Sequence, residues 1–346
     1  MANRTVVITG ASSGFGQGAA LKFAEAGDNV VLAARRKNLL EEVAERCKQL
    51  GAKAVALKTD VSDPQEIAEL AERAVSEFGR IDVWINNAGV GTIGRFDEAP
   101  LQDHEQVIRT NLLGTMYGSY EAIRIFRSQG HGTLINVGSV AGEVGSAYMS
   151  SYAASKFGVR GFGMALREEL EVNGEKDIHV CTVEPDSHDT PFFEHAANYT
   201  GKKSTPLGTA HDPENVISTI FELASNPQDK VLVGSSGKLA ANAHRVLPKV
   251  VETQMGKKSH KNYAEQTERA PQSSQSVREP MESGRDVYGG FTSKGEKSRQ
   301  EHESGGRGWM KYLAFAVPTA LLVAAVANRD RVARAVQDVT RTETAA

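Results

Sequence analysis

Residues 5–27 read TVVITGASSGFGQGAALKFAEAG: a short β-branched run, a glycine-rich turn and a stretch with helical spacing. Gly10 suits a tight turn, because glycine adopts left-handed backbone angles without steric cost. Gly14 lets the backbone approach a pyrophosphate closely, and Gly16 permits the helix to pack against the strand. The free N–H groups and the positive end of that helix would face the phosphates. This order of strand, turn and helix predicts a nucleotide-binding loop.

Six further apolar runs continue the pattern along the first 250 residues. They read NVVLAA (29–34), KAVAL (53–57), IDVWIN (81–86), GTLINV (132–137), DIHVCTV (177–183) and KVLVG (230–234). Helical spacing fills the stretches between them, for example over residues 64–78, with Asp63 as N-cap, and over residues 152–172. Continuous apolar strands that alternate with helices predict an α/β fold with a doubly wound, seven-stranded parallel sheet, the Rossmann fold.

Composition excludes several classes of protein. The formal net charge is −3 and no dense basic run occurs, so a nucleic-acid binder is not expected. The two cysteines, Cys47 and Cys181, are too few for a disulfide framework or a cysteine-rich zinc site. The N-terminus runs directly into a strand without a secretory signal, which favours the cytoplasm.

The chain divides into three predicted parts. Residues 1–250 form the nucleotide-binding domain. Residues 251–308 are rich in polar residues and poor in large apolar ones, which predicts a disordered linker. Residues 309–346 contain an apolar helix, apolar over 312–327, and a basic tail. Aromatic and basic flanks favour membrane contact through residues 309–328, while a helix that packs on its own domain or on a partner is the alternative.

The end of the second strand should decide which dinucleotide binds. An acidic side chain there would bind the ribose 2′-hydroxyl, whereas an arginine accommodates a 2′-phosphate. The segment VVLAARRK (30–37) carries no carboxylate and ends in Arg35 and Arg36. A guanidinium matches phosphate in bidentate geometry, so the sequence predicts NADP(H) over NAD(H). The alternative is that both arginines are solvated charges at the start of a helix.

Five motifs occur in one order along the chain: TGASSGFG (9–16), NNAG (86–89), Asn111 after a threonine, Ser139, and YAASK (152–156). Together they resemble the short-chain dehydrogenase/reductase family, in its single-domain branch. The resemblance covers about residues 4–235. It implies an NAD(P)-dependent oxidoreductase that acts on CH–OH or C=O groups.

The chemistry of the YAASK motif can be argued from its residues. Positions i and i+4 share one helix face, so Tyr152 and Lys156 project side by side. An ammonium favours the phenolate and would lower the pKa of Tyr152, which could then act as a general acid or base. Ser139 could hold the substrate oxygen by a hydrogen bond. By resemblance, Lys156 also contacts the nicotinamide ribose and Asn111 holds a water molecule in a proton relay.

The resemblance also implies a set of cofactor contacts. These are Gly10, Ser12, Ser13, Gly14, Phe15, Gly16, Arg35, Arg36, Asp60, Val61, Asn87, Ala88, Gly89, Tyr152, Lys156, Pro185 and Thr190. The segment EPDSHDTP (184–191) departs from the family pattern, because Asp186 stands where glycine is usual. Aspartate adopts unusual backbone angles less easily, so the local loop shape is open.

The segment after Asp186 raises two more questions. His188, His195 and His211 lie near acidic residues, but their spacing matches no standard ligand pattern, so solvated loop histidines and no metal are expected. Phe192, Phe193 and Tyr199 suggest an apolar wall of the substrate site, with core packing as the alternative.

The sequence therefore predicts an oxidoreductase that transfers a hydride between NADP(H) and a small carbonyl or secondary alcohol, with Tyr152 as general acid/base. Two alternatives are an NAD-linked alcohol dehydrogenase on the same scaffold and a non-catalytic, membrane-tethered nucleotide sensor. The resemblance implies a homo-oligomer. The substrate is not encoded in the fold or the catalytic residues.

Overall fold

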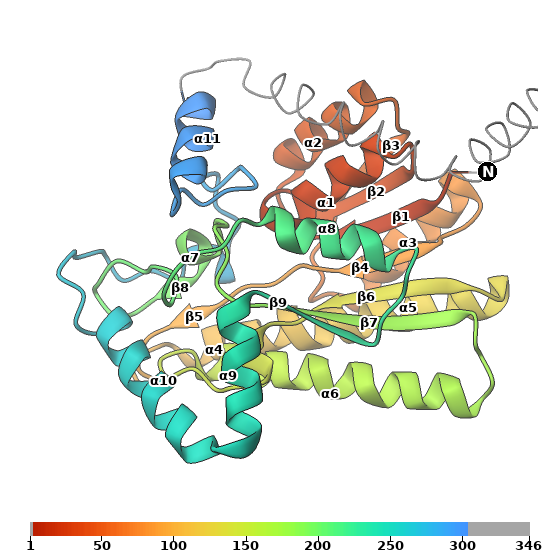
Figure 1. Cartoon of the computed structure of the whole chain (residues 1–346). Helices are drawn as coiled ribbons and strands as arrows, with labels where there is room; N and C mark the ends of the chain where they lie inside the picture. Colours follow the sequence, from red (N-terminus) through yellow and green to blue (C-terminus); the bar gives the residue numbers. More distant parts are fainter. Residues whose placement is uncertain (1–2, 304–346) are drawn as a thin grey trace, which may run out of the picture. The chain divides into compact units, whose positions relative to one another are not determined.

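The computed structural model describes residues 3–303, and its centre is a seven-stranded parallel sheet (Figure 1). The strands are β1 (Thr5–Thr9), β2 (Asn29–Ala34), β3 (Ala54–Lys58), β4 (Val83–Asn86), β6 (Gly132–Val137), β7 (Ile178–Pro185) and β9 (Lys230–Val233). Their order is β3-β2-β1-β4-β6-β7-β9, and every neighbouring pair is parallel. The predicted α/β fold is confirmed.

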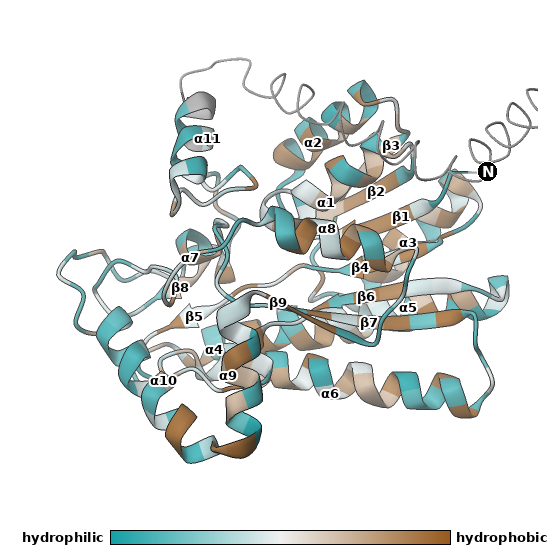
Figure 2. Ribbon diagram, in the orientation of Figure 1, coloured by the Kyte–Doolittle hydropathy of each residue, from teal (hydrophilic) through white to brown (hydrophobic). Residues whose placement is uncertain are grey.

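Helices cover both faces of this sheet. The helices α1 (Gly14–Glu25), α2 (Lys37–Gln49) and α8 (Glu214–Leu223) bury side chains in one apolar cluster. The helices α3 (Pro64–Phe78), α5 (Gly114–Gln129) and α6 (Ser150–Val172) bury theirs in the other. Strand β1 alternates between the two, because Val6 and Ile8 join the first cluster and Val7 joins the second. Apolar colour runs along the central strands in Figure 2.

Local signals in the sequence explain two of these helices. Helix α3 begins after Asp63, whose side chain accepts a hydrogen bond from the Gln65 N–H at 2.8 Å, so the predicted N-cap is confirmed. The Glu66 carboxylate in the first turn of α3 accepts a hydrogen bond from the Asp60 N–H at 2.7 Å, which connects the helix to the segment after β3. Helix α6 begins at Ser150, two residues before the predicted start.

The connections that follow β4, β6 and β7 contain several short elements. They are β5 (Thr92–Ile93), α4 (Leu101–Ile108), a π-helical turn (Arg109–Leu113), a 3-10 turn (Val140–Gly142), α7 (Phe192–His195) and β8 (Ala197–Asn198). Strands β5 and β8 pair in parallel as a separate two-stranded sheet, which the sequence did not predict.

After β9 the chain first forms α9 (Ser235–Val246), within the predicted domain 1–250. The predicted disordered linker, residues 251–308, is described through residue 303 and differs from the prediction there: it contains the rest of α10 (Pro248–Tyr263), a 3-10 turn (Gln275–Val277) and α11 (Ser293–Glu303). Residues 251–296 belong to the same compact unit as the sheet. A few apolar side chains bury this polar segment against the domain: Tyr263, Val277 and Tyr288 are at most 5% exposed. We call residues 264–292 the strap.

The predicted apolar helix at 309–346 lies outside the described residues. Within residues 3–303, no helix is both long and apolar enough to cross a membrane.

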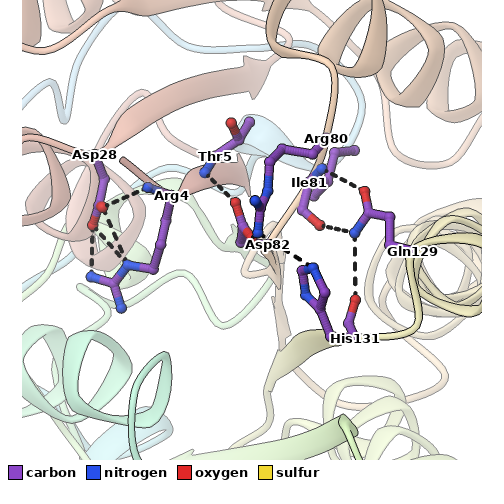
Figure 3. Close-up of polar contacts among 8 residues, drawn as sticks. All are labelled: Arg4, Thr5, Asp28, Arg80, Ile81, Asp82, Gln129 and His131. Carbon is purple, nitrogen blue, oxygen red and sulfur yellow. Dashed lines mark hydrogen bonds and ion pairs between the residues drawn. The ribbon is translucent and has the colours of Figure 1, made fainter. Parts of the chain in front are cut away.

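Polar side chains tie the strands together at their amino ends (Figure 3). The Asp82 carboxylate, just before β4, accepts from the Thr5 N–H of β1 at 2.8 Å and pairs with Arg80. Arg4 pairs with Asp28 at 2.7 Å, which joins the starts of β1 and β2. The opposite edge of the sheet, where parallel strands end, is the edge at which α/β proteins bind ligands.

Replacing Asp82 with alanine should destabilise this amino edge. The substitution leaves the N–H of Thr5, a residue only 1% exposed, without its acceptor, and a buried unsatisfied donor costs about 1–3 kcal/mol. Chemical denaturation should show a lower midpoint, while the exposed Asp97→Ala control should unfold like the wild type. Equal midpoints for both variants would contradict this role of Asp82.

Candidate active site

The glycine-rich loop joins β1 to α1 with little room for side chains. Gly10 and Gly14 have φ angles of +66° and +56°, in the left-handed region. A Cβ atom on Gly16 would lie 2.4 Å from the Gly10 carbonyl oxygen, so the third glycine is required for close packing. The side chain of the N-cap residue Ser13 makes no capping bond, so it satisfies none of the first-turn N–H groups of α1. This cradle fits a phosphate group.

Two further loops complete the wall beside the cradle. Asn87 donates from Nδ2 to the Thr9 carbonyl at 2.9 Å, and its own N–H donates to Thr9 Oγ1 at 3.0 Å. These bonds fix the NNAG turn against the end of β1. After β3, the Asp60 carboxylate accepts from the Ser62 N–H at 2.9 Å, which forms a tight turn beside Val61.

Arg35 and Arg36 follow β2 and point to the strap rather than to open solvent. Arg36 donates to Ser12 Oγ at 3.1 Å and to Ser13 Oγ at 2.6 Å, so it lies against the glycine-rich loop. Its pKa is lowered to about 10, chiefly because burial disfavours the charged guanidinium. Arg36 is also the N-cap residue of α2, as the alternative expected, but both side chains are hydrogen-bonded rather than solvated. The preference for NADP(H) stays a prediction.

The YAASK motif lies in the first two turns of α6, as its spacing predicts. The Lys156 Nζ atom lies 5.7 Å from the centre of the Tyr152 ring and donates to the Val137 carbonyl at 2.8 Å. Ser139 is the N-cap of the short turn after β6, where its Oγ accepts from the Ala141 N–H at 3.1 Å. The Ser139 hydroxyl also interacts with the Tyr152 hydroxyl and opposes the rise in its pKa. The three side chains therefore meet at the end of β6.

The ionisation of this group differs from the sequence-based prediction. The pKa of Tyr152 is raised to about 12, because burial disfavours the phenolate more than Ser139 favours it. The pKa of Lys156 is lowered to about 8, because burial disfavours the ammonium. The expected lowering of the Tyr152 pKa is therefore not found in the chain by itself, because desolvation outweighs the hydrogen bond with Ser139.

Asn111 lies in the π-helical turn between α4 and α5 and is 1% exposed. Its Oδ1 accepts from the Val90 N–H at 2.8 Å, and its Nδ2 donates to the Val90 carbonyl at 2.9 Å and to Ser155 Oγ at 3.0 Å. A Cβ atom on Gly89 would meet Asn111 at 3.4 Å and Lys156 Nζ at 3.7 Å. Asn111 thus joins the NNAG turn to α6, and its role in a proton relay stays a prediction.

A cavity of about 340 Å³ gathers these side chains. It is lined by every residue of the predicted catalytic and cofactor sets except Gly16 and Asn111. Gly16 packs against the Gly10 carbonyl oxygen, and Asn111 lies next to Gly89. Each therefore shapes the cavity through a neighbour that lines it.

Comparisons with known proteins agree with this geometry. The family model described as short chain dehydrogenase matches residues 4–199. The chain belongs to the short-chain dehydrogenase/reductase family. It is an oxidoreductase of the kind that acts on alcohol or carbonyl groups.

Individual relatives support the assignment. The chain is 35% identical over 266 residues to the uncharacterized oxidoreductase YxnA of Bacillus subtilis (strain 168), with 76% of this chain and 74% of that protein covered. A short-chain dehydrogenase/reductase from Burkholderia phymatum in complex with NAD shares the fold, with a TM-score of 0.66, 23% identity, and coverage of 78% and 98%. An alcohol dehydrogenase from Thermococcus sibiricus complexed with 5-hydroxy-NADP has a TM-score of 0.59, 23% identity, and coverage of 67% and 96%.

The departure from the family pattern at Asp186 has a structural explanation. Asp186 keeps an ordinary negative φ, so no glycine is needed there. Its Oδ2 accepts from the Gly237 N–H at 3.1 Å and from Ser236 Oγ at 2.7 Å, in the first turn of α9. The carboxylate thus caps a helix. Thr190, on the same loop as Asp186, lies against the glycine-rich loop: a Cβ atom on Gly14 would be 3.7 Å from the Cβ atom of Thr190.

Two of the three histidines differ from the expected solvated side chains, whereas the His211 side chain is 29% exposed. His188 is only 3% exposed, and its Nδ1 donates to the Asp186 carbonyl at 3.1 Å. His195 donates from Nε2 to the Ser283 carbonyl of the strap at 3.1 Å. Burial lowers the pKa of both. Among residues 3–303 no group of three or more acidic, histidine or cysteine side chains could hold a metal ion.

An apolar wall lies beside Tyr152. The ring of Phe192 is 5.1 Å from that of Tyr152, and Phe192 in turn contacts Phe193 at 5.2 Å. Tyr199 does not line the cavity, since its hydroxyl bonds to Asp103. The sequence missed Tyr263 of α10, which lines the cavity and is 2% exposed. A lone large aromatic residue in a polar helix was its only signal.

Proposed function

We propose that the chain interconverts a carbonyl and a secondary alcohol with NADP(H) as hydride partner. The supporting observation is that Ser139, Tyr152 and Lys156 line the same cavity as the glycine-rich loop and both arginines. One ligand that spans the cavity would therefore reach both the phosphate cradle and the catalytic hydroxyl groups. The apolar wall around Phe192 favours an uncharged reacting group next to Tyr152.

The residues that would hold the cofactor follow from the fit of the cradle. First-turn N–H groups of α1 would bind the pyrophosphate, Val61 would pack on the adenine, and Arg36 would bind a 2′-phosphate. Lys156 would bind the nicotinamide ribose through its Nζ, which is held by the Val137 carbonyl. When bound, the nicotinamide supplies or accepts a hydride, which the side chains of this chain cannot do.

The remaining steps belong to the side chains. Ser139 Oγ would donate a hydrogen bond to the substrate oxygen and hold it beside Tyr152. Tyr152 would donate its phenolic proton to that oxygen during carbonyl reduction and accept it back during alcohol oxidation. Because the pKa of Tyr152 is about 12 in the chain alone, a positive charge beside it is needed for efficient transfer. Protonated Lys156, whose Nζ lies 5.7 Å from the centre of the Tyr152 ring, would supply such a charge.

The preference for NADP(H) over NAD(H) rests on Arg35 and Arg36. In Arg36→Ala we expect the Michaelis constant for NADPH to rise roughly 10- to 100-fold, since a charge-assisted bond contributes about 1.5–3 kcal/mol. The constant for NADH should change little. Steady-state kinetics with a carbonyl panel would measure both, and the exposed Arg73→Ala on α3 is the control. A wild-type preference for NADH would instead support the NAD-linked alternative.

A further inference from the structure

The strap makes an unusual set of contacts with the two arginines that follow β2. Arg36 Nη1 donates to the carbonyl oxygens of Met281 at 3.2 Å, Ser283 at 3.0 Å and Gly284 at 3.2 Å. Arg35 donates to the carbonyl oxygens of Ser276 and Arg278. Five backbone oxygens from one short segment therefore surround two neighbouring guanidinium groups.

The strap contacts use both hydrogens of Arg36 Nη1. Nε and Nη2 donate to Ser12 and Ser13, and the Nη1 hydrogens are shared among the three strap carbonyls. A guanidinium has no acceptor and Nη1 has only two N–H donors, so an oxygen ligand that binds through Nη1 must replace a strap carbonyl. Phosphate oxygens and carbonyl oxygens are both acceptors, and they cannot occupy the same position on Nη1.

The strap is also held at positions on either side of these carbonyls. On one side, Ser273 and Asn198 exchange backbone bonds of 2.8 and 3.0 Å, and Arg278 pairs with the buried Asp103. On the other side, the Asp189 carboxylate accepts from the N–H groups of Gly289, Phe291 and Thr292 at 2.9–3.0 Å. Between them, the Asp286 carbonyl accepts from the Gly14 N–H of the glycine-rich loop at 3.0 Å.

Charge distinguishes the strap from the ligand that these arginines suit. Carbonyl groups are neutral, so they satisfy the donors of Arg35 and Arg36 without neutralising their charge. The strap also brings Glu282 and Arg285 near Arg36, and their charges act on its pKa in opposite directions. A phosphate would both accept the hydrogen bonds and neutralise the guanidinium, and it can do so in bidentate geometry. The strap therefore resembles a weaker occupant that a phosphorylated ligand could displace.

We propose that the strap is a built-in competitor for the 2′-phosphate subsite. Its carbonyl oxygens at 281, 283 and 284 occupy Arg36 until a ribose 2′-phosphate displaces them, whereas a dinucleotide without that phosphate competes only with the Asp286 carbonyl at the Gly14 N–H. The strap thus lowers the apparent affinity for NADP(H), because only the fraction of molecules with a released strap can bind it. This inference rests on the proposed 2′-phosphate site at Arg36.

A wedge in the strap tests the competition in the full-length chain. A Cβ atom on Gly289 would lie 2.3 Å from the Thr190 carbonyl oxygen, so Gly289→Ala should unseat the strap. The matched control is Gly256→Ala on α10, where a Cβ atom has nothing within 4 Å. Binding of NADPH, NADH, adenosine 2′,5′-bisphosphate and 5′-AMP should be measured by calorimetry or cofactor fluorescence.

We expect Gly289→Ala to bind NADPH and adenosine 2′,5′-bisphosphate roughly tenfold more tightly than the wild type, with a smaller gain for NADH and 5′-AMP, which compete only with the Asp286 carbonyl. The control variant should match the wild type. Weaker NADPH binding in Gly289→Ala would show that the strap clamps the cofactor, and equal gains for all four ligands would show that it does not compete at the 2′-phosphate. Either result overturns the proposal.

Hydrogen exchange in the wild type gives an independent test. Adenosine 2′,5′-bisphosphate should speed the exchange of the amides of Gly289, Phe291 and Thr292, whereas 5′-AMP should not. Slower exchange, or no change, with the bisphosphate at saturation would overturn the proposal. If Arg36→Ala leaves NADPH binding intact, the assignment of the 2′-phosphate to Arg36 itself fails. If Arg36→Ala weakens NADPH binding but the bisphosphate does not release the strap, the assignment stands and only the proposed competition fails.

Discussion

Replacing Tyr152 with phenylalanine should lower kcat by roughly 10²–10⁴-fold, the usual contribution of a positioned general acid/base. The variant keeps the ring, so its packing at 5.1 Å from Phe192 is retained. It loses only the hydroxyl that faces Ser139. Cofactor affinity should therefore change little, because the phosphate cradle and Lys156 are unaltered.

This result separates catalysis from binding. Turnover of a carbonyl panel with NADPH measures catalysis, and fluorescence titration with NADPH measures cofactor binding. Tyr120→Phe, at a side chain that is 66% exposed, is the matched control and should behave as the wild type. Full activity in Tyr152→Phe would sink the mechanism. A wild type that binds NADPH but reduces no carbonyl would favour the nucleotide-sensing alternative.

The comparison of sequence and structure depends on how local each signal is. Seven apolar runs predicted seven strands, because a strand buried on both faces must be apolar along its whole length. The N-cap at Asp63 was equally readable, since its partner lies two residues away. The residues of the site were predictable because motifs at strand ends converge when parallel strands align.

Long-range contacts explain what the sequence did not reveal. The strap is polar, and its order comes from backbone carbonyls that bind Arg35 and Arg36 more than 240 positions earlier. Composition predicts disorder because it counts apolar side chains and cannot count such bonds. The pKa of Tyr152 also depends on long-range packing: the spacing to Lys156 is visible in the sequence, whereas the burial that raises the pKa of Tyr152 is not.

Alanine at Gly16 should disrupt the site through packing alone. Its Cβ atom would lie 2.4 Å from the Gly10 carbonyl oxygen and 2.5 Å from Asn87 Nδ2. Both neighbours are fixed, because Gly10 directly follows β1 and Asn87 is bonded to the Thr9 carbonyl. Relief requires the helix to move away from the loop, and such overpacking costs roughly 1–3 kcal/mol. The same movement would pull the first-turn N–H groups of α1 away from the phosphate cradle.

We therefore expect Gly16→Ala to unfold at a lower denaturant concentration and to lose binding of NADPH and NADH alike. The loss should be common to both cofactors because the pyrophosphate is common to both, in contrast to the selective loss in Arg36→Ala. Gly161→Ala on α6 is the matched control: its Cβ atom meets nothing within 4 Å, and alanine favours a helix by about 1 kcal/mol. If Gly16→Ala binds both cofactors as the wild type does, α1 tolerates a shift and the close approach at Gly16 does not shape the cradle.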